Sequence, residues 1–518
     1  MTSPNRRAVY RQRRLLTFLV IICVIAVGIL IALAATSIHN KNHSAGTDAT
    51  QDPGSAYNSG VPIMPIGTQQ ATDGTAGPEA TDLPVTPAPT AVPPANYKEV
   101  AAHSSATTSV HGFYTELMVS GLLANSYSAA EKISFANDAD YAEIEGITTF
   151  RGSCARRDPF FGVADISTGK LQILWNRETF SVGKGEGGKY SGVWTGSGWT
   201  GQALVVRWDA ETKAIMNMYD SAKAKDGLIE VIYATMDGNI YFYDMETGEP
   251  TRNKIVMGVP FKGAGSIDPR GIPVLYVGQG DHYSAEGKAA KAYAISLIDG
   301  KVLATFGAKP DPFAKRTWHA YASAPIIDGD TDTLFYPGEN GILYRVKLNT
   351  EYDKAAGTLT MKPDNMIKLR YHTARTDNGG YWLGYESSAI AWRNYLYVCD
   401  NAGYMQCIDV NTMKTVWVQD IWDDTNATPC LEEDPANNTA YLYVGNTLDN
   451  KADANGHGKV AFFKIDACTG EIIWPAESEI YTTHDITGGY LLELDTYDDY
   501  HVKQVSDFET AGEQPIQF

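Results

Sequence analysis

The sequence predicts an all-β protein, a β-propeller of six to eight four-stranded blades that follows an N-terminal transmembrane helix and a disordered stalk. Six times, two hydrophobic runs joined by a tight turn lead into a second turn of the Thr-Gly, Asp-Gly or Asn-Thr type. Tyr, Trp and Phe, which favour strands, number 30, 10 and 16. No long run with helical periodicity lies between positions 155 and 485. A hairpin repeat of this size cannot bury its apolar face alone, which predicts a propeller.

The first elements predict a membrane anchor. Residues 1–14 form a basic segment without acids, and an uncharged apolar run from Leu15 to Ala35 begins the predicted helix at 15–38. At about 1.5 Å per residue, this run spans a hydrocarbon core of roughly 30 Å. We expect a single-pass protein of the cell membrane, with a cytoplasmic N-terminus and an extracytoplasmic C-terminal domain. The alternative is a cleaved signal peptide, but its apolar core is usually only about 7–15 residues long.

Residues 39–97 are rich in Pro, Thr and Ala and carry few large apolar side chains. Such a segment buries too little apolar surface to offset the entropy of ordering it. We therefore expect a disordered stalk, extended near its Pro-rich end, that holds the folded domain away from the membrane.

Residues 98–518 form the predicted propeller domain, and residues 98–150 are its lead-in segment. We expect a short helix within positions 104–136, and few strands within 491–518. The predicted blades lie at about 198–252, 263–306, 319–353, 383–420 and 424–474. A last blade begins near 486 in this prediction, and a strand at 159–175 completes it.

The best repeats are Val231–Gly248 and Lys459–Trp474, which follow the order strand, turn, strand ending in Asp, and Thr-Gly. This pattern resembles the pyrrolo-quinoline quinone (PQQ) type of β-propeller repeat over residues 159–475. The resemblance implies that a Trp after the second turn docks against the next blade, and Trp175, Trp417 and Trp474 hold that position.

The resemblance also bears on catalysis. Quinone-dependent dehydrogenases of this superfamily carry adjacent cysteines over the cofactor and a calcium beside a catalytic Asp, but the present sequence has no Cys-Cys pair. Nucleophile-elbow, zinc-protease and phosphate-loop motifs are also missing from it. We expect neither PQQ nor another cofactor, no catalytic residues, and a protein that is not an enzyme.

One turn could hold Ca²⁺, although a solvated acidic turn is the favoured interpretation. Asp328, Asp330 and Asp332 alternate there, as the ligands of cation loops do, but a following Gly and a distal Glu are missing. The cysteines permit one guess, a bridge between Cys430 and Cys468. A bridge between Cys399 and Cys407 is not expected, because the hairpin offsets them.

The loops that enter the innermost strands carry aromatic side chains, and these are the predicted ligand-face residues. They are Trp194, Trp199, Trp318, His319, Tyr381, Trp382 and Trp422. Exposed aromatic rings are common anchors for protein partners and for sugar rings. The alternative for each ring is packing between blades.

The charge excludes one class of partner. The whole chain carries −19, and the extracytoplasmic part, without the five arginines of the leader, carries −24. Nucleic acids require basic patches, so they are not expected as partners. The sequence therefore predicts a non-catalytic protein-binding scaffold of the cell envelope. The alternatives are a module that binds wall polysaccharide and a quinone- or metal-dependent oxidoreductase.

Overall fold

The computed structural model describes residues 96–162, 169–170, 172–183, 192–197, 201–281, 290–308, 310–377, 381, 383–447 and 460–478, and four short strands beyond them. The chain divides into two compact units, Met1–Ala88 and Pro89–Phe518, and the described residues belong to the second. The predicted transmembrane helix and all but the last residues of the predicted stalk lie outside them. Among the described residues, no helix is both long enough and apolar enough to cross a membrane.

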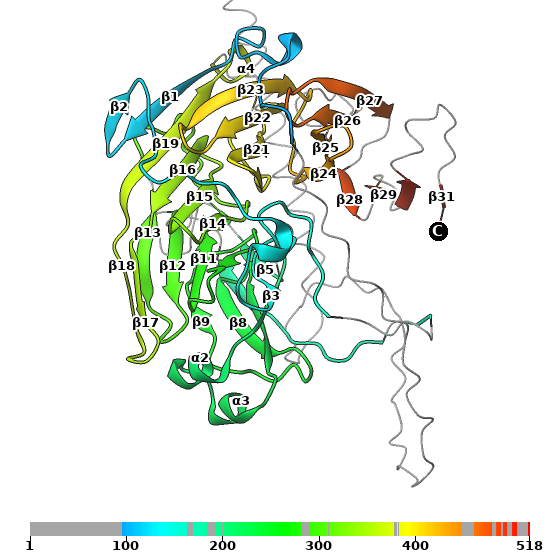
Figure 1. Ribbon diagram of the computed structural model, residues 1–518. Coiled ribbons are helices and arrows are strands. Elements are labelled where there is room, and N and C mark those ends of the chain that lie inside the picture. Colours follow the sequence, from blue (N-terminus) through cyan, green and yellow to red (C-terminus); the bar gives the residue numbers. More distant parts are fainter. Residues whose placement is uncertain are drawn as a thin grey trace, which may run out of the picture. The chain divides into compact units, whose positions relative to one another are not determined.

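The described part is built from antiparallel sheets that follow one another along the chain (Figure 1). The first sheet consists of β3 (Gly146–Ile147), β6 (Leu204–Arg207), β7 (Ile229–Ala234), β8 (Asn239–Asp244) and β9 (Ile255–Val256). The second consists of β10 (Ser266–Ile267), β11 (Val274–Gly278), β12 (Ala292–Ser296) and β13 (Val302–Phe306). The third has the order β14 (Ile326–Asp328), β15 (Thr333–Pro337), β16 (Ile342–Lys347), β19 (Asp364–His372), β1 (Tyr114–Val119) and β2 (Leu122–Ala124).

Three more sheets complete the series. The fourth consists of β20 (Ile390–Trp392), β21 (Tyr395–Cys399), β22 (Tyr404–Asp409) and β23 (Lys414–Asp420). The fifth consists of β24 (Cys430–Asp434), β25 (Thr439–Gly445), β26 (Val460–Asp466) and β27 (Ile472–Ser478). The sixth consists of β28 (Thr483–Thr487), β29 (Tyr490–Leu494), β30 (Tyr500–Gln504) and β31 (Ile516–Gln517).

Smaller elements decorate these sheets. Two hairpins are added, β4 (Ser181–Gly183) with β5 (Val193–Thr195), and β17 (Thr350–Asp353) with β18 (Thr358–Met361). The helices are short: α2 (Ala210–Ile215), α3 (Asp220–Ala224), α4 (Ala374–Asp377) and two 3₁₀ turns at Ser104–Ala106 and Asp138–Asp140. Figure 1 shows α2 and α3 at one end of the first sheet.

The cores lie between consecutive sheets. Ile232 and Phe242 of the first sheet pack with Leu275 and Ile295 of the second. Three further clusters join the second sheet to the third, the third to the fourth, and the fourth to the fifth. Middle strands such as β11 and β15 are consequently buried at every residue, whereas the outer strand β13 is largely exposed. This serial face-to-face packing of sheets is the packing of propeller blades. Each of the five predicted blades overlaps one of the first five sheets, but the third was predicted to end at 353, and its outer strand β19 lies beyond that position.

The expected helix in the lead-in segment is wrong. Residues 114–124 form the hairpin β1–β2, and β1 pairs antiparallel with β19 over six residues, from Tyr114 opposite His372 to Val119 opposite Ile367. Figure 1 shows this hairpin beside β19. Phe113 stacks on Tyr371 with ring centroids 5.3 Å apart. The free edge of β19 offers unpaired backbone groups, and satisfying them outweighs the weak local helical pattern.

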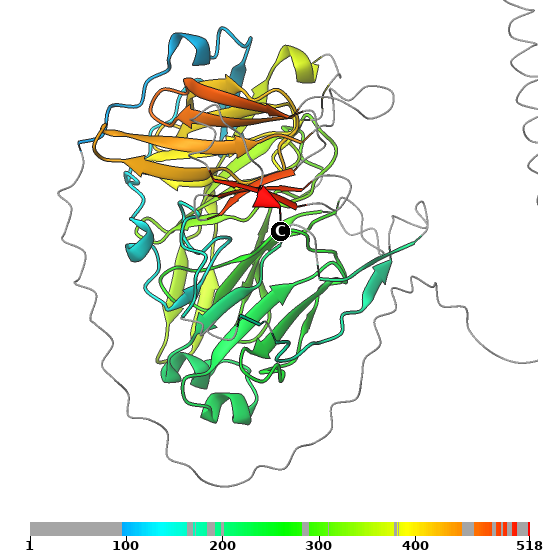
Figure 2. The same ribbon diagram turned by 90° about the vertical axis from the view of Figure 1, so that its right-hand side faces the viewer.

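The predicted closing of the last blade is also wrong. Within the described residues of 159–175 there is no strand, and the sixth sheet has four strands of its own. Three of these strands lie in the segment 491–518 or at its border, where few were expected. Figure 2 shows the sixth sheet beside the fifth, and β28 lies against β25.

Trp docking follows the resemblance at two of the three sites. The Trp417 Nε1–H donates to the carbonyl oxygen of Ala467 at 3.1 Å, three residues before Gly470. Trp175 does the same at the first sheet, where its Nε1–H donates to Met245 O at 2.8 Å, three residues before Gly248. Within the described residues, Trp474 contacts Tyr443 and Phe462 of its own sheet.

A segment at residues 146–158 links the innermost strands. The buried Arg156 guanidinium donates to Ala389 O at 3.1 Å, Ala324 O at 3.1 Å and Pro325 O at 3.3 Å. Burial lowers the pKa of Arg156 to about 10. The Thr148 carbonyl oxygen of this segment accepts a hydrogen bond from Ile267 N of the second sheet at 2.7 Å. Arg151 donates from Nη1 to Thr428 O, just before the fifth sheet, at 3.2 Å.

The guessed disulfide is wrong. Cys468 is a free thiol whose Sγ lies 3.8 Å from Lys98 O, whereas the Cys430 Sγ accepts a hydrogen bond from Arg151 at 3.2 Å. Cys399 and Cys407 are not bridged, because Tyr397 stands opposite Cys407 and Met405 opposite Cys399.

Candidate binding face

At one end of the sheets, backbone hydrogen bonds join neighbouring blades. We call each pair of these bonds a stitch, and this end the stitched end. The turns that follow β7, β11, β15 and β21 lie at this end, and so do the loops that lead from each of the first four sheets into the next. The Phe261 N–H donates to Thr235 O in the first sheet at 3.1 Å. The N–H of Gly280 in the second sheet donates to Pro260 O at 2.7 Å. Each connecting loop is therefore fixed to the blades on both sides of it.

The same stitch recurs at the next two boundaries. Tyr321 N donates to Gln279 O at 2.9 Å, and Glu339 N donates to Ala320 O at 3.0 Å. Tyr385 N donates to Gly338 O at 3.1 Å, and Asn401 N donates to Gly384 O at 2.9 Å. We call this end the binding face, defined by the turns 235–238, 279–281, 338–341 and 400–403 and by the described residues of the loops 257–265, 307–325, 373–389 and 421–429.

Two predicted tryptophans stand on carboxylates of this face. Trp194, on β5, donates its Nε1–H to Asp281 Oδ2 at 2.5 Å. Trp318 donates its Nε1–H to Glu339 Oε2 at 2.6 Å. Both side chains are half-buried, so one part of each ring is fixed and another part is open to solvent.

The other two half-buried aromatics belong to the following loops. The Arg375 guanidinium lies 5.2 Å from the Tyr381 ring, and its Nη2 donates to Asp420 Oδ2 at 2.5 Å. Trp422 has a φ of +78°, a conformation that is uncommon for a bulky residue. Its backbone crosses the turn at Gly403, where an added Cβ would lie 2.7 Å from Trp422 C. Packing against the turn thus forces this conformation.

The remaining predicted ligand-face residues divide into two groups. His319 is only 2% exposed and its Nδ1 lies 3.3 Å from Asn340 Nδ2, so it belongs to the interior. Trp199 and Trp382 lie outside the described residues. The aromatics that make the stitches, Phe261, Tyr321 and Tyr385, are fully buried and serve packing.

The sequence analysis missed a carboxyl pair at the same face. Glu339, which accepts from Trp318, is 2% exposed, and Glu386 follows the stitched Tyr385. Burial and the neighbouring Glu386 carboxylate raise the pKa of Glu339 to about 8, against the lowering effect of Lys262 and Arg316. Glu339 therefore keeps its proton near neutral pH. The available signal was Glu339 in the Gly-Glu-Asn-Gly turn at 338–341, because a carboxyl group stands there at the turn position that Asn401 holds in the next blade.

A second buried acid lies one blade further on. Burial raises the pKa of Asp400 to about 7, although its carboxylate accepts hydrogen bonds from Ala402 N at 2.9 Å and Tyr404 N at 2.8 Å. These bonds close the turn at 400–403, which shows that Asp400 shapes the face from inside.

The acidic turn proposed for Ca²⁺ uses two of its carboxylates internally. Asp328 Oδ2 accepts from Thr331 N at 3.0 Å, and burial raises the pKa of Asp328. Asp332 pairs with Arg270 at 2.6 Å, and Asp330 is exposed. Within the described ranges, no group of three His, Cys, Asp or Glu side chains is arranged to hold a metal ion.

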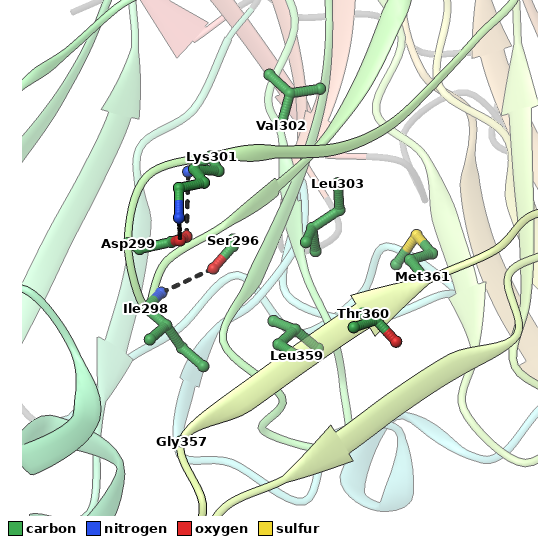
Figure 3. A pocket seen from close by; sticks show the side chains of 10 residues that line it. All are labelled: Ser296, Ile298, Asp299, Lys301, Val302, Leu303, Gly357, Leu359, Thr360 and Met361. Carbon is green, nitrogen blue, oxygen red and sulfur yellow. Dashed lines mark hydrogen bonds and ion pairs between the residues drawn. The ribbon is translucent and has the colours of Figure 1, made fainter.

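A pocket of about 370 Å³ lies away from the binding face, between β13 and β18 (Figure 3). Leu303, Leu359 and Met361 line its apolar side. Lys301 and Asp299 pair at 2.6 Å on its rim, so their charges offset one another. The pocket offers apolar contact without an uncompensated charge.

No protein-family model matches the chain, and no curated protein matches it. Among solved structures, it is similar to BamB from Moraxella catarrhalis, at 13% identity and a TM-score of 0.35, over 67% of this chain and 84% of the other. It is also similar to a europium-containing methanol dehydrogenase, at 12% identity and a TM-score of 0.39, over 72% and 85%.

A third similar structure is the quinohemoprotein alcohol dehydrogenase from Comamonas testosteroni, at 11% identity and a TM-score of 0.39, over 71% and 72% of the two chains. These neighbours come from the PQQ-like β-propeller superfamily that the repeats resemble. At such identities and TM-scores, the likeness assigns no activity and no ligand to the chain.

Proposed function

We propose that the chain is a non-catalytic binding module of the cell envelope and that a protein partner binds at the binding face. One observation carries this proposal: four half-buried aromatic side chains, Trp194 of β5 and Trp318, Tyr381 and Trp422 of three successive loops, lie at the stitched end of the sheets. Aromatic side chains with a fixed part and an open part are typical anchors of protein interfaces.

The anchors are held in place before a partner arrives. The indole N–H groups of Trp194 and Trp318 are bonded to carboxylates, and Arg375 lies over Tyr381. Binding therefore costs little side-chain entropy at these positions, which favours affinity. The envelope location in the proposal rests on the basic segment and apolar run at the N-terminus.

A second function is binding of wall polysaccharide, and the open parts of the Trp194 and Trp318 rings favour it. Asp281 and Glu339 hold the two indoles in place, and the exposed ring surfaces can stack on sugar faces. The two functions require the same face and differ in the partner.

The test uses the full chain in native membranes. Chemical crosslinking to proteins is compared with sedimentation of the detergent-solubilised chain on insoluble wall glycan. We expect a discrete crosslinked protein that Trp318→Ala and Tyr381→Ala each reduce at least about fivefold, as truncation of an interface anchor does. Tyr219→Ala is the control, because this 42% exposed ring stands beside α3, away from the face.

Glycan sedimentation that the two face variants abolish would replace the protein partner by polysaccharide. Equal losses of the crosslinked protein in Tyr219→Ala and in the face variants would show that the partner does not bind at the binding face. The same preparation, supplied with quinone and calcium, is assayed for a bound-quinone absorption band and for dye reduction with alcohols and sugars. A positive result there would contradict the non-catalytic assignment.

A further inference from the structure

Lys315 bridges two loops of the binding face. It belongs to the loop 307–325, which carries Trp318, and its Nζ contacts Asp377 Oδ1 of α4, in the loop that carries Tyr381. The same Nζ contacts the Nδ1 of His372, at the end of β19. The Lys315 side chain is 25% exposed and the His372 side chain 9%, so the bridge lies at the border between interior and solvent.

His372 is held on its other side by β1. Its Nε2 lies 2.5 Å from Glu116 Oε2, which Arg370 also contacts through Nε at 2.6 Å. The Tyr114 ring stacks on the imidazole with centroids 4.3 Å apart and planes 10° apart. The imidazole is therefore fixed between a carboxylate and an ammonium group.

This arrangement specifies one protonation state. A lysine ammonium has only donors, so His372 Nδ1 must accept, and Nε2 must carry the hydrogen that is donated to Glu116. A second proton on the ring would occupy Nδ1 and face the Lys315 ammonium directly. Asp377 Oδ1 is 3.6 Å from Nδ1 and would then accept from the imidazolium instead of from Lys315.

We propose that protonation of His372 expels Lys315 from the bridge and loosens the two loops that carry Trp318 and Tyr381, so that mild acid weakens binding at this face. Histidine side chains change charge between about pH 5 and 8, which makes the device usable at physiological pH. The effect on binding rests on the proposed function, whereas the loosening of the loops does not.

The charges around His372 support the replacement of Lys315 by the imidazolium as the partner of Asp377. The groups that face the imidazole are Glu116 from β1, Arg370 from β19, Lys315 and Asp377. The pKa values of Glu116 and Asp377 are both lowered, although burial alone would raise them. Hydrogen bonds from His372 and Arg370 outweigh burial at Glu116, and a hydrogen bond from Lys315 outweighs it at Asp377. Both carboxylates therefore remain ionised in mild acid and receive the imidazolium.

Hydrogen–deuterium exchange of the full chain in detergent micelles tests the device at pH 7.5 and pH 5.5, with rates corrected for the intrinsic effect of pH. We expect protection of peptides within 310–325 and 373–377 to fall about tenfold at pH 5.5, as the loss of about 1.4 kcal/mol of interaction energy would produce. Peptides of β21 and β22 are expected to stay unchanged. His372→Gln should remove the pH dependence, because the amide mimics the neutral ring and cannot ionise.

Lys315→Met supplies a second variant, with both loops loosened equally at the two pH values. His103→Gln is the matched control and should behave as the unaltered chain, since the His103 ring contacts Ser105 Oγ at 2.8 Å and Glu471 Oε1 at 3.7 Å, beside the fifth sheet. Unaltered protection of β21 and β22 in each variant shows that it is folded.

Retention of the full pH dependence in His372→Gln, or no loosening in Lys315→Met, would overturn the proposal. The exchange measurement needs no partner, so loosening without any captured partner would refute the proposed function and leave the device intact. If the loops loosen at pH 5.5 but the yield of the captured partner is equal at both pH values, the loosening does not affect binding. That result would refute the regulatory role of His372.

Discussion

At the scale of single residues, two glycines make the slots in which tryptophans dock. An added Cβ on Gly470 would lie 2.7 Å from Trp417 Cδ2, and one on Gly248 would lie 2.5 Å from Trp175 Cδ2. These contacts are closer than side-chain atoms can approach without displacement. The slots explain why Thr-Gly turns and tryptophans occur together in the repeat.

Gly470→Ala should therefore destabilise the protein more than Gly357→Ala, which is a matched control. Both glycines have a positive φ, +73° and +64°, so each alanine carries similar backbone strain. The nearest atom to an added Cβ at Gly357 is 3.4 Å away, in Ile215. Clash with the indole should cost about 1–3 kcal/mol more at Gly470, measured by urea unfolding of the full chain. Equal losses would show that Trp417 moves freely.

Side-chain chemistry could be predicted from the sequence only in part. The tight loops predicted which aromatics lie at the face, and four of them are half-buried there, but His319 is not, because the sequence does not reveal which side of a loop faces inward. Glu339 and Glu386 were missed because their pairing joins two blades that are 47 positions apart, and no local pattern encodes such a contact.

At the scale of elements, the blades were predictable and the segments between them were not. Hydrophobic runs and turn residues are local signals, and they located most strands of the first five sheets, although β19 lies beyond the predicted end of its blade at 353. The lead-in segment was predicted as a helix, but β1 pairs with β19, about 250 positions later. Its structure depends on a distant edge that the local sequence does not describe.

The central segment 146–158 gives a prediction at this scale. Arg156→Met should destabilise the protein by about 3 kcal/mol or more, because several buried carbonyl oxygens lose their donor at about 1–3 kcal/mol each. These oxygens belong to Ala324, Ala389 and Phe150, whereas Pro325 O keeps a donor in Ser266 Oγ at 2.8 Å. Thermal unfolding of the full chain measures the loss.

Arg393→Met is the control for that measurement. Arg393 donates to one backbone oxygen, Lys98 O, at 2.9 Å and is partly exposed. Its loss should cost about 1 kcal/mol or less. If the two variants were equally stable, the central segment would not link the blades.

At the scale of the whole molecule, serial packing of the sheets followed from the number and spacing of the repeats. The way the series ends did not, because the sixth sheet takes all four strands from the C-terminal region. Its hydrophobic runs are short and interrupted, so few strands could be predicted there. The dependence of stability on pH is also a property of the whole molecule.

Stability should fall as the pH rises from about 5 to 8. Burial raises the pKa of Glu339 from 4.5 to about 8 and that of Asp400 from 3.8 to about 7. Within these windows the folded protein keeps protons that the unfolded chain has released, so raising the pH favours unfolding. Glu339→Gln should flatten the fall in melting temperature, and the exposed Glu471→Gln should not. An unchanged slope in Glu339→Gln would contradict the raised pKa.

The central claim is that the stitched end of the sheets binds a protein partner. Site-specific photo-crosslinking in native membranes tests it most directly, with the photoreactive residue at Thr317 or Asn426 on the binding face, or at Asn437 in the β24–β25 turn at the opposite end. All three positions are exposed. The account predicts one discrete adduct from both face positions and none from Asn437. Adducts from Asn437 alone, or equally from all three positions, would contradict it.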